Sequence, residues 1–278
     1  MMRAASFAFV LLTATCATAA PLRVATLLPY VEDALGRLGD RVEVVAAVRR
    51  DMRTPPPPPV VDLGSPHSPN LERLAEAEPK LVVGDRALHG ALRDRLARTG
   101  AEVMLVDSGS VDATFDGLAA VARRADSADV MGREIAAARM KIGASVLAQH
   151  VPTLVLFGAP GSFLVVTDRT WLGDLLRRLN FDNLGARVTG SERHPGFVGV
   201  SDEVLAGLRP EIVLLVAHGD PDALRAAFEK KLAEGGAWAG LRASATRGVH
   251  VLPGALFTTN PGLGMAEAAQ QLRDLARP

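Results

Sequence analysis

Short apolar runs alternate with helical patterns along almost the whole chain. The first half contains "LRVATLL", "VEVVAAV", "KLVVGD" and "EVMLVD", and the second contains "TLVLFGA", "FLVVTD", "EIVLLVAH" and "GVHVLPG". Runs of this length, rich in β-branched residues, are typical of strands buried on both faces of a parallel sheet. Strands that alternate with helices predict α/β layers. We therefore expect two α/β lobes of the Rossmann-like kind, one from each half of the chain.

Between these two sets of runs lies a segment without strand-like alternation. Its last part, "SADVMGREIAAARMKIGASVLAQ", predicts a continuous helix over residues 126–150. A helix of about 25 residues would span almost 40 Å, because each residue adds about 1.5 Å. The predicted organisation is an N-terminal lobe at 20–125, a single helix at 126–150 that joins the lobes, and a C-terminal lobe at 151–278.

The two halves also echo each other. "SPNLERLAEAEPKLVVG" at 68–84 and "GVSDEVLAGLRPEIVLL" at 199–215 share Glu, Leu, Pro and a following apolar run at one constant offset. Each segment predicts a short helix, a proline break and a buried strand. Duplication of an ancestral lobe explains this echo, and so does the frequency of helix, proline and strand units in α/β proteins.

The N-terminus has the pattern of a secretory signal peptide. Arg3 precedes an apolar run, which ends in the small residues Ala17, Thr18 and Ala19. This order predicts residues 1–19 as a signal peptide and export to the periplasm. Lipid attachment at Cys16 is the alternative, although the residues before Cys16 depart from the usual lipobox. Cleavage after Ala19 would remove the only cysteine and so exclude disulfides.

Composition excludes several functions. Lys+Arg and Asp+Glu number 31 each, and the isoelectric point is about 7.0, so no basic excess favours nucleic acid. No later stretch has the length and apolarity of a membrane span, which predicts a soluble mature protein. The G-x-S-x-G elbow, the G-x-x-x-x-G-K-[ST] phosphate loop and the H-E-x-x-H helix are all missing from the sequence. A hydrolase or a nucleotide enzyme is therefore poorly supported.

Two of the six histidines differ from the others. His67 lies in "SPHSP", and His218 ends an apolar run before Gly-Asp-Pro, so each is predicted on a turn between a strand and a helix. Ligands of α/β proteins gather at such strand ends. Two facing imidazoles can fill both axial positions of a haem iron. Zinc is the rival, but a closed zinc site needs about four ligands and no further cluster is evident. An ordinary loop position remains the alternative for each histidine.

The other histidines have ordinary expected places. In "RALHGALRDRLARTG" the histidine is predicted on the solvent side of an amphipathic helix, and the others at a helix end, in a loop and in a strand. These four residues are His89, His150, His194 and His250.

Three segments together resemble a known family. "GSPHSPNLERL", "TLVLFGAPGSFLVVTDRTWLGDLL" and "LRPEIVLLVAHGDPDALRAAFEKKL" are similar to segments of the substrate-binding proteins of ABC importers for iron chelates, haem and corrinoids, and within that family to the haem receptor lipoproteins. The resemblance covers nearly the whole mature chain. It implies two α/β lobes joined by one long helix, with the ligand in a cleft between the lobes.

The resemblance also implies roles for single residues. In haem receptors of this family a methionine in a P-M-S-P motif and a histidine in a P-H-G motif bind the iron, and the matching positions here are His67 and His218. An imidazole in place of the thioether keeps an iron ligand. Family members dock onto the permease through one glutamate per lobe, and Glu72 and Glu203 match these positions, with an ordinary role in a helix's first turn as the alternative.

The remaining pocket residues are less defined by sequence. Phe157, Phe163 and Trp171 are candidate apolar neighbours of a porphyrin, with a position in the core as the alternative for each. Guanidinium groups pair well with propionates. The sequence offers four such groups without choosing among them, Arg49, Arg50, Arg53 and Arg169.

Taken together, the sequence and the resemblance predict a monomeric, extracytoplasmic haem-binding protein. It would deliver haem to an ABC permease with its ATPase, and would meet the membrane only through that permease or a lipid anchor. A corrinoid or a ferric siderophore on the same scaffold is the first alternative, weakly disfavoured by few aromatic residues, Phe 9, Trp 2 and Tyr 1. A haem-dependent oxidoreductase or a metal hydrolase is the second, and two axial ligands would leave such an enzyme no open iron position.

Overall fold

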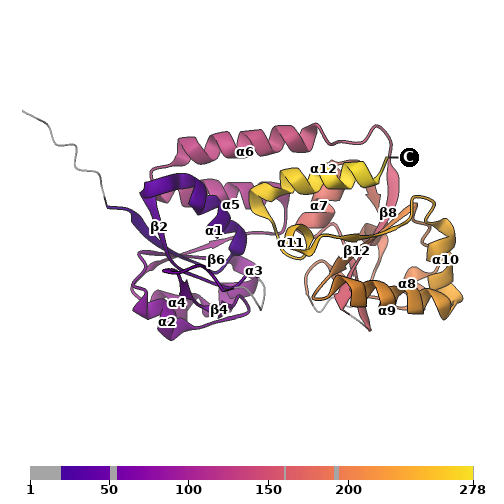
Figure 1. Ribbon diagram of the computed structural model, residues 1–278, viewed down its shortest axis with the longest axis horizontal. Coiled ribbons are helices and arrows are strands. Elements are labelled where there is room, and N and C mark those ends of the chain that lie inside the picture. The colour runs from indigo at the N-terminus through magenta and orange to yellow at the C-terminus, as the bar shows by residue number, and fades with distance from the viewer. Residues whose placement is uncertain (1–19, 51–54, 160, 191–193, 278) are drawn as a thin grey trace, which may run out of the picture.

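The computed structural model describes residues 20–50, 55–159, 161–190 and 194–277. The predicted signal peptide at 1–19, which includes Cys16, and the candidate Arg53 therefore lie outside the described residues. The chain forms two α/β lobes side by side, each around its own sheet (Figure 1). This confirms the predicted fold class.

The first lobe is built on a five-stranded, fully parallel sheet. Its strand order is β3-β2-β1-β6-β7. The strands are β1 (Leu22–Thr26), β2 (Val42–Ala47), β3 (Val61–Asp62), β6 (Leu81–Asp85) and β7 (Glu102–Val106). They are connected by α1 (Pro29–Leu35), η1 (Gly36–Arg41), α2 (Leu71–Glu76), α3 (Arg86–His89), η2 (Gly90–Leu92) and α4 (Arg93–Ala97). A small hairpin of β4 (Gly64–Ser65) and β5 (Ser68–Pro69) lies between β3 and α2.

The second lobe has a mixed sheet with the order β11-β9-β8-β12-β13, and β10 also pairs with β8. Its strands are β8 (Val151–Ala159), β9 (Ser162–Val166), β10 (Phe181–Asn183), β11 (Phe197–Gly199), β12 (Ile212–Ala217) and β13 (Val249–Leu252). Its helices are α7 (Trp171–Arg178), η3 (Leu184–Arg187), α8 (Asp202–Leu205), α9 (Pro221–Ala233) and α10 (Gly236–Ser244). All eight apolar runs of the sequence contain strands, and the helix, proline and strand units at 68–84 and 199–215 both form.

Two consecutive helices connect the lobes. α5 (Val111–Arg124) packs on the first lobe, and α6 (Ala128–Gly143) runs above the first lobe toward the second, which the chain reaches through the segment after α6 (Figure 1). The predicted helix over 126–150 is therefore too long, because α6 ends at Gly143, a poor helix former. The residues after it are tied to the second lobe instead, since the Leu147 amide donates to the Leu179 carbonyl and Asn180 Nδ2 donates to the Leu147 carbonyl. His150 therefore lies beyond the helix and not at its end.

The C-terminal segment returns toward the first lobe. It contains α11 (Gly254–Phe257), η4 (Gly262–Gly264) and α12 (Met265–Leu275), and α12 lies along α6 (Figure 1). Asn260 Nδ2 donates to the Ser108 carbonyl and to Thr114 Oγ1 in the first lobe. A Cβ at Gly262 would lie 2.9 Å from a ring atom of Tyr30, so only glycine allows this approach. The lobes are thus joined by α6 and by this returning segment.

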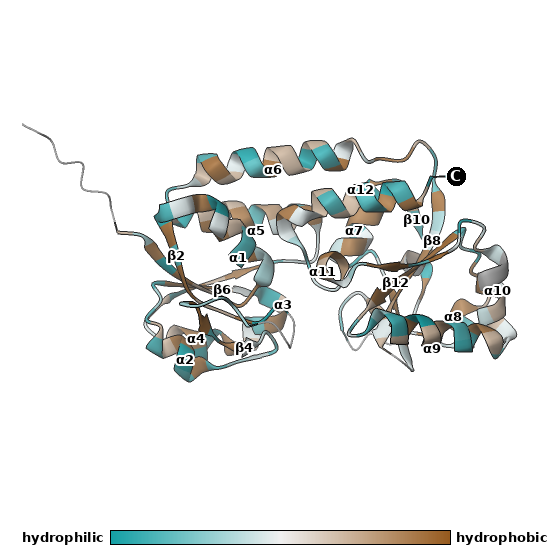
Figure 2. Cartoon of the chain, in the orientation of Figure 1, coloured by the Kyte–Doolittle hydropathy of each residue, from teal (hydrophilic) through white to brown (hydrophobic). Residues whose placement is uncertain are grey.

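Hydrophobic residues lie mainly in the sheets and on the helix faces that cover them (Figure 2). One buried cluster runs through both lobes, because side chains of α5, α6, α7 and α12 pack together between the sheets. Phe115 of α5, Leu175 of α7 and Leu272 of α12 all belong to it. The two lobes therefore share one hydrophobic core at their junction.

A charged network crosses the same junction. Asp174 on α7 has a side chain only 8 % exposed, and its carboxylate accepts a hydrogen bond of 3.0 Å from the Val111 amide at the start of α5. Arg178 donates to Asp174 at 2.9 Å and to Asp112 at 2.6 Å. Burial raises the pKa of Asp174, but hydrogen bonds from the Val111 amide, Arg178 and Arg177 outweigh it, so the pKa lies below its usual value.

Asp174→Asn is expected to lower the free energy of unfolding by on the order of 3 kcal/mol at pH 7, because it removes the buried negative charge to which both Arg177 and Arg178 donate. Since the folded pKa is depressed, the carboxylate stabilises the protein above the ordinary pKa of about 4, and this contribution disappears as the pH falls further. Urea unfolding of the wild type and of Asp174→Asn at pH 7 and at pH 3 measures the difference in the free energy of unfolding. The exposed pair of Asp182 and Arg187 supplies the control, Asp182→Asn, with an expected loss below about 1 kcal/mol. Equal losses for the two variants would contradict this account.

Candidate functional site

His67 lies at the tip of the small hairpin in the first lobe. Gly64 pairs with Pro69 and Ser65 pairs with Ser68, so Pro66 and His67 form the two central residues of a tight turn. We call residues 65–68 the His67 turn. Its imidazole is exposed, and its backbone amide donates to Ser65 Oγ at 3.2 Å. The predicted turn from a strand to a helix is instead a turn between two short strands, because β5 follows His67 and α2 starts only after the N-cap Asn70.

A second histidine supports this turn. The prediction that His89 faces solvent is wrong, because its side chain is completely buried. Nδ1 of His89 accepts a hydrogen bond of 2.8 Å from the Asp85 amide, and Nε2 lies 2.8 Å from the Pro66 carbonyl oxygen. Burial lowers the pKa of His89, which favours the neutral ring that this pattern requires. The available sequence signal was the position of His89 in the first turn after a buried strand.

An ion pair lies at the base of the hairpin. Arg49 Nε and Nη2 donate to one carboxylate oxygen of Asp62 at 2.8 and 2.6 Å, and the other oxygen accepts from the Gly64 amide. These bonds from Arg49 hold the pKa of Asp62 below its usual range. Arg49 therefore stabilises the base of the hairpin through its ion pair with Asp62.

His218 lies in the second lobe at the carboxyl end of β12. Its amide donates to the Gly158 carbonyl at 2.8 Å, and its imidazole is exposed. Gly219 follows with φ of 112°, which a side chain would disfavour, and Asp220 caps α9 by accepting from the Asp222 and Ala223 amides. This is the predicted turn from strand to helix. Thr258 Oγ1 also donates to the Ala217 carbonyl and so fixes the strand end.

The three aromatic candidates separate in the structure. The half-buried Phe157 ring lies 5.9 Å from the His218 ring and 5.4 Å from the Phe197 ring, centroid to centroid. Phe163 instead packs in the core of the second lobe, with Phe228 and Trp238 as ring neighbours. Successive side chains of a strand point to opposite faces of the sheet, and Phe163 pairs with Gly158, the residue after Phe157. Phe163 therefore lies on the face of the sheet opposite to Phe157. Phe197 was not among the aromatic candidates, because it belongs to no motif of the sequence.

Trp171 and the two remaining arginines lie near the junction of the lobes. Trp171 stacks on Phe257 of α11 with a centroid distance of 6.4 Å. Arg169 is exposed in the loop before α7, and its carbonyl oxygen lies 3.8 Å from the place of a Cβ on Gly109 in the first lobe. Arg50 pairs with Asp33 of α1 through two hydrogen bonds of 2.8 and 2.5 Å.

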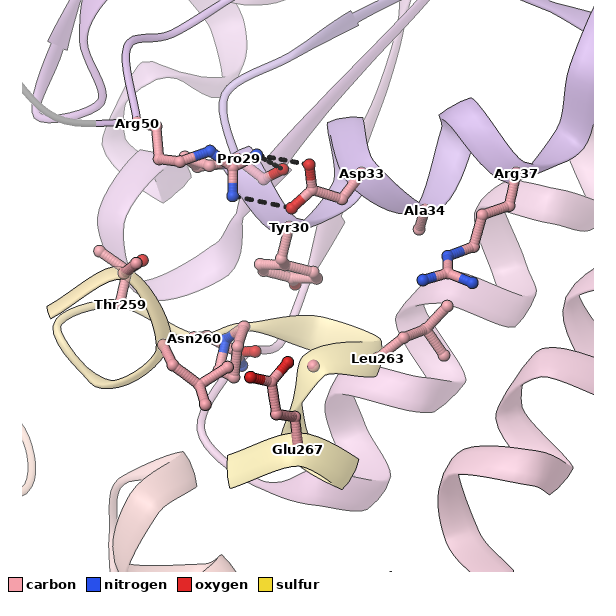
Figure 3. A pocket seen from close by; sticks show the side chains of 14 residues that line it. Pro29, Tyr30, Asp33, Ala34, Arg37, Arg50, Thr259, Asn260, Leu263 and Glu267 are labelled. Carbon is pink, nitrogen blue, oxygen red and sulfur yellow. Dashed lines mark hydrogen bonds and ion pairs between the residues drawn. The ribbon is translucent and has the colours of Figure 1, made fainter. Parts of the chain in front are cut away.

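A cavity of about 490 Å³ lies between α1 and the returning C-terminal segment (Figure 3). Tyr30, Arg50, Asn260 and Glu267 are among the residues that line it. Of the candidate ligand-binding residues, Arg50 alone belongs to this lining. The cavity is therefore separate from the two turns that carry His67 and His218.

The two glutamates are exposed on short helices. Glu72 lies in the first turn of α2, and Glu203 lies in the first turn of α8. These helices belong to different lobes, and both lie on the side of the molecule away from α6 (Figure 1).

Two further observations concern the described residues alone. Among them, no three His, Cys, Asp or Glu side chains gather as they would around a metal ion. A search of the same residues also finds no helix with the length and apolarity of a membrane span.

The chain is similar to known proteins that take up or bind haem or a siderophore. IsdE, the high-affinity haem uptake system protein of Staphylococcus aureus, is 23 % identical over 221 residues, which cover 78 % of this chain and 74 % of IsdE. The crystal structure of S. aureus IsdE complexed with haem superimposes with a TM-score of 0.76 at 21 % identity, over 92 % of this chain and 99 % of that one. The siderophore-binding protein BauB, bound to two acinetobactin molecules and ferric iron, superimposes with a TM-score of 0.70 at 17 % identity, over 94 % of both chains.

The resemblance inferred from the sequence motifs is thus confirmed, both for the family and for its haem receptors. Residues 25–256 match the periplasmic binding protein family, and this range includes most of both lobes and all of α6. The chain belongs to the periplasmic binding protein family.

Proposed function

We propose that this protein binds haem outside the cytoplasm and delivers it to an ABC importer, with His67 and His218 as the two axial ligands of the iron. The observation that carries the proposal is the matched placement of these histidines. His67 lies exposed in a hairpin turn of the first lobe and His218 lies exposed at the carboxyl end of β12 in the second lobe, and neither imidazole has a side-chain hydrogen bond within the described part of the chain. Both rings therefore keep a nitrogen for a metal.

The chemistry of the two turns suits a metalloporphyrin. A porphyrin supplies four nitrogens, so the protein needs to supply only the two axial ligands. His67 and His218 are exposed on opposite lobes, and no cluster of three metal-ligating side chains is found among the described residues. Phe157 and Phe197 beside His218 offer aromatic surface to the apolar porphyrin face. Haem uptake by IsdE and the haem-bound IsdE structure support the same ligand.

A ferric siderophore or a corrinoid is the competing ligand. The observation in its favour is the likeness to BauB in complex with a ferric siderophore. Ferric siderophores carry their own iron ligands and are usually held by charged side chains, which Arg50 and Arg169 could supply. In this alternative His67 and His218 would not contact the iron.

Titration of the purified mature protein with haemin, a corrinoid and a ferric siderophore separates these ligands. We expect a saturable, one-to-one change of the haem Soret band with a dissociation constant in the micromolar range or below, and no saturation with the other two. A double variant, His67→Ala with His218→Ala, should lose the haem response. Saturation with a siderophore and an unchanged Soret band would contradict the proposal.

The protein is proposed to perform no chemistry on its ligand. Two axial histidines would leave the iron without an open position for peroxide or another substrate. The named relatives are uptake and binding proteins. Haem-loaded protein should therefore show no steady peroxidase rate.

The location follows from the same proposal. Residues 1–19 would direct secretion and be cleaved after Ala19, which places the mature protein in the periplasm as a monomer. Lipid attachment at Cys16 is the alternative, and the mass of the mature protein distinguishes the two.

We further propose that Glu72 and Glu203 dock the protein onto the permease. Replacing both with alanine should leave the haem affinity unchanged and abolish stimulation of the importer's ATPase, because two carboxylate contacts to permease arginines would be lost. The matched control replaces Glu76 and Glu229, which are acidic helix residues outside the predicted docking positions. ATPase assays with the importer in lipid vesicles measure the effect. Loss of haem binding in the Glu72/Glu203 variant would place these residues in the ligand site instead.

A further inference from the structure

We propose that His89 is a positioning residue that holds the His67 turn in the conformation required for iron ligation. This inference rests on the proposed function, because it assigns a task to a residue that supports one of the two proposed ligands. His89 itself contacts the turn at Pro66 and is not proposed as a ligand.

The hydrogen bonds of His89 connect the sheet to the turn. The Asp85 amide is a donor, so Nδ1 must accept, and the proton of the neutral ring lies on Nε2 and is donated to the Pro66 carbonyl. Asp85 ends the buried strand β6 and also caps α3 through the Ala87 and Leu88 amides. The completely buried imidazole thus joins a rigid strand end to a residue 23 positions earlier.

The turn needs support from outside. Two-residue hairpin turns that match the twist of their strands require positive φ at the first central residue, which proline cannot adopt. Pro66 occupies this position, and neither Pro66 nor His67 has a positive φ. The flanking strands have only two residues each, so they add few hydrogen bonds. Pro66 lies outside the two paired positions of the hairpin, and its carbonyl oxygen accepts a hydrogen bond of 2.8 Å from Nε2 of His89.

The surroundings of His89 are shaped to this ring. A Cβ on Gly84 would lie 3.1 Å from Nδ1 of His89 and 3.2 Å from Cδ2 of Leu105, so the strand leaves room for the imidazole. Both ring nitrogens are satisfied, as buried polar groups require. A simple space-filling role would not require a ring with one acceptor and one donor at these two places.

Two conservative variants of His89 each keep one of its two hydrogen bonds and remove the other. His89→Gln places an amide donor near the position of Nε2 and keeps the bond to Pro66, whereas His89→Asn keeps only the acceptor near Nδ1 for Asp85. Each variant loses one bond, so their stabilities toward urea should be similar. If His89 positions the turn, the two variants should differ in the ferric haem spectrum.

We expect His89→Asn to bind haem about tenfold more weakly than the wild type and to show a mixture of six-coordinate and five-coordinate iron. His89→Gln should retain the wild-type spectrum and affinity within about threefold. Gly84→Ala, which pushes against Nδ1 without removing the ring, should shift the spectrum in the same direction as His89→Asn. This third variant keeps the test available if His89→Asn does not fold.

Hydrogen exchange in the protein without haem separates this inference from the proposed function. The amides of His67 and Ser68 should exchange faster in His89→Asn than in His89→Gln. Equal exchange and equal spectra in the two variants would overturn the positioning role. An exchange difference between the two variants, together with a wild-type protein whose addition never changes the Soret band of haemin, would refute haem binding while leaving His89 as the residue that fixes the turn.

Discussion

Replacing His218 with alanine is expected to weaken haem binding at least about 100-fold and to leave a five-coordinate or water-ligated iron. Even substitutions in the outer shell of metal sites typically cost 10–100-fold in affinity, and His218 is proposed as a direct ligand. His67→Ala should have the same kind of effect, because each imidazole fills one axial position. Haemin titration with absorption spectra measures both the affinity and the coordination of the iron.

His150 provides a control in the same lobe. It is also exposed, but it precedes β8, whereas His218 follows the neighbouring parallel strand β12. The two histidines therefore lie at opposite ends of the sheet, on the order of 20 Å apart at about 3.3 Å per strand residue. His150→Ala should bind haem like the wild type. An equal loss of affinity in His150→Ala and His218→Ala would mean that histidine ligation does not explain binding.

His67→Met is expected to keep haem bound and to raise its reduction potential by tenths of a volt. A thioether stabilises ferrous iron relative to an imidazole, and axial ligands together span a range of about 0.8 V. The Met side chain reaches as far as an imidazole and needs no change in the backbone of the turn. Spectroelectrochemical titration of the haem-loaded variant and wild type measures the shift. An unchanged potential with an intact spectrum would show that residue 67 does not contact the iron.

The sheets and the position of His218 could be predicted from sequence because local signals agree there. "EIVLLVAH" is a continuous apolar run, and the following Gly-Asp-Pro combines a turn residue, an N-cap and a first-turn proline. The hairpin around His67 gave no such signal, since its two-residue strands are too short for any hydrophobic period. The two prolines indicated a rigid turn there, but not its pairing.

The errors have a common physical origin in contacts between distant segments. His89 belongs to a pattern that suggests one amphipathic helix, but Gly90 breaks that pattern into α3, η2 and α4, and the ring turns inward to reach Pro66. The helix after residue 126 ends early because Asn180 and Leu179 bind the chain at Leu147. Phe163 is buried because α9 and α10 cover its face of the sheet with Phe228 and Trp238. None of these contacts can be inferred from neighbouring residues.

The central claim is that one histidine from each lobe binds the haem iron. The resonance Raman spectrum of the ferric wild-type complex, recorded beside His67→Ala and His218→Ala, tests it most directly. The proposal predicts a six-coordinate, low-spin iron in the wild type and loss of that state in each variant. A five-coordinate, high-spin wild type, or a six-coordinate low-spin spectrum that survives in either variant, would contradict ligation by His67 and His218.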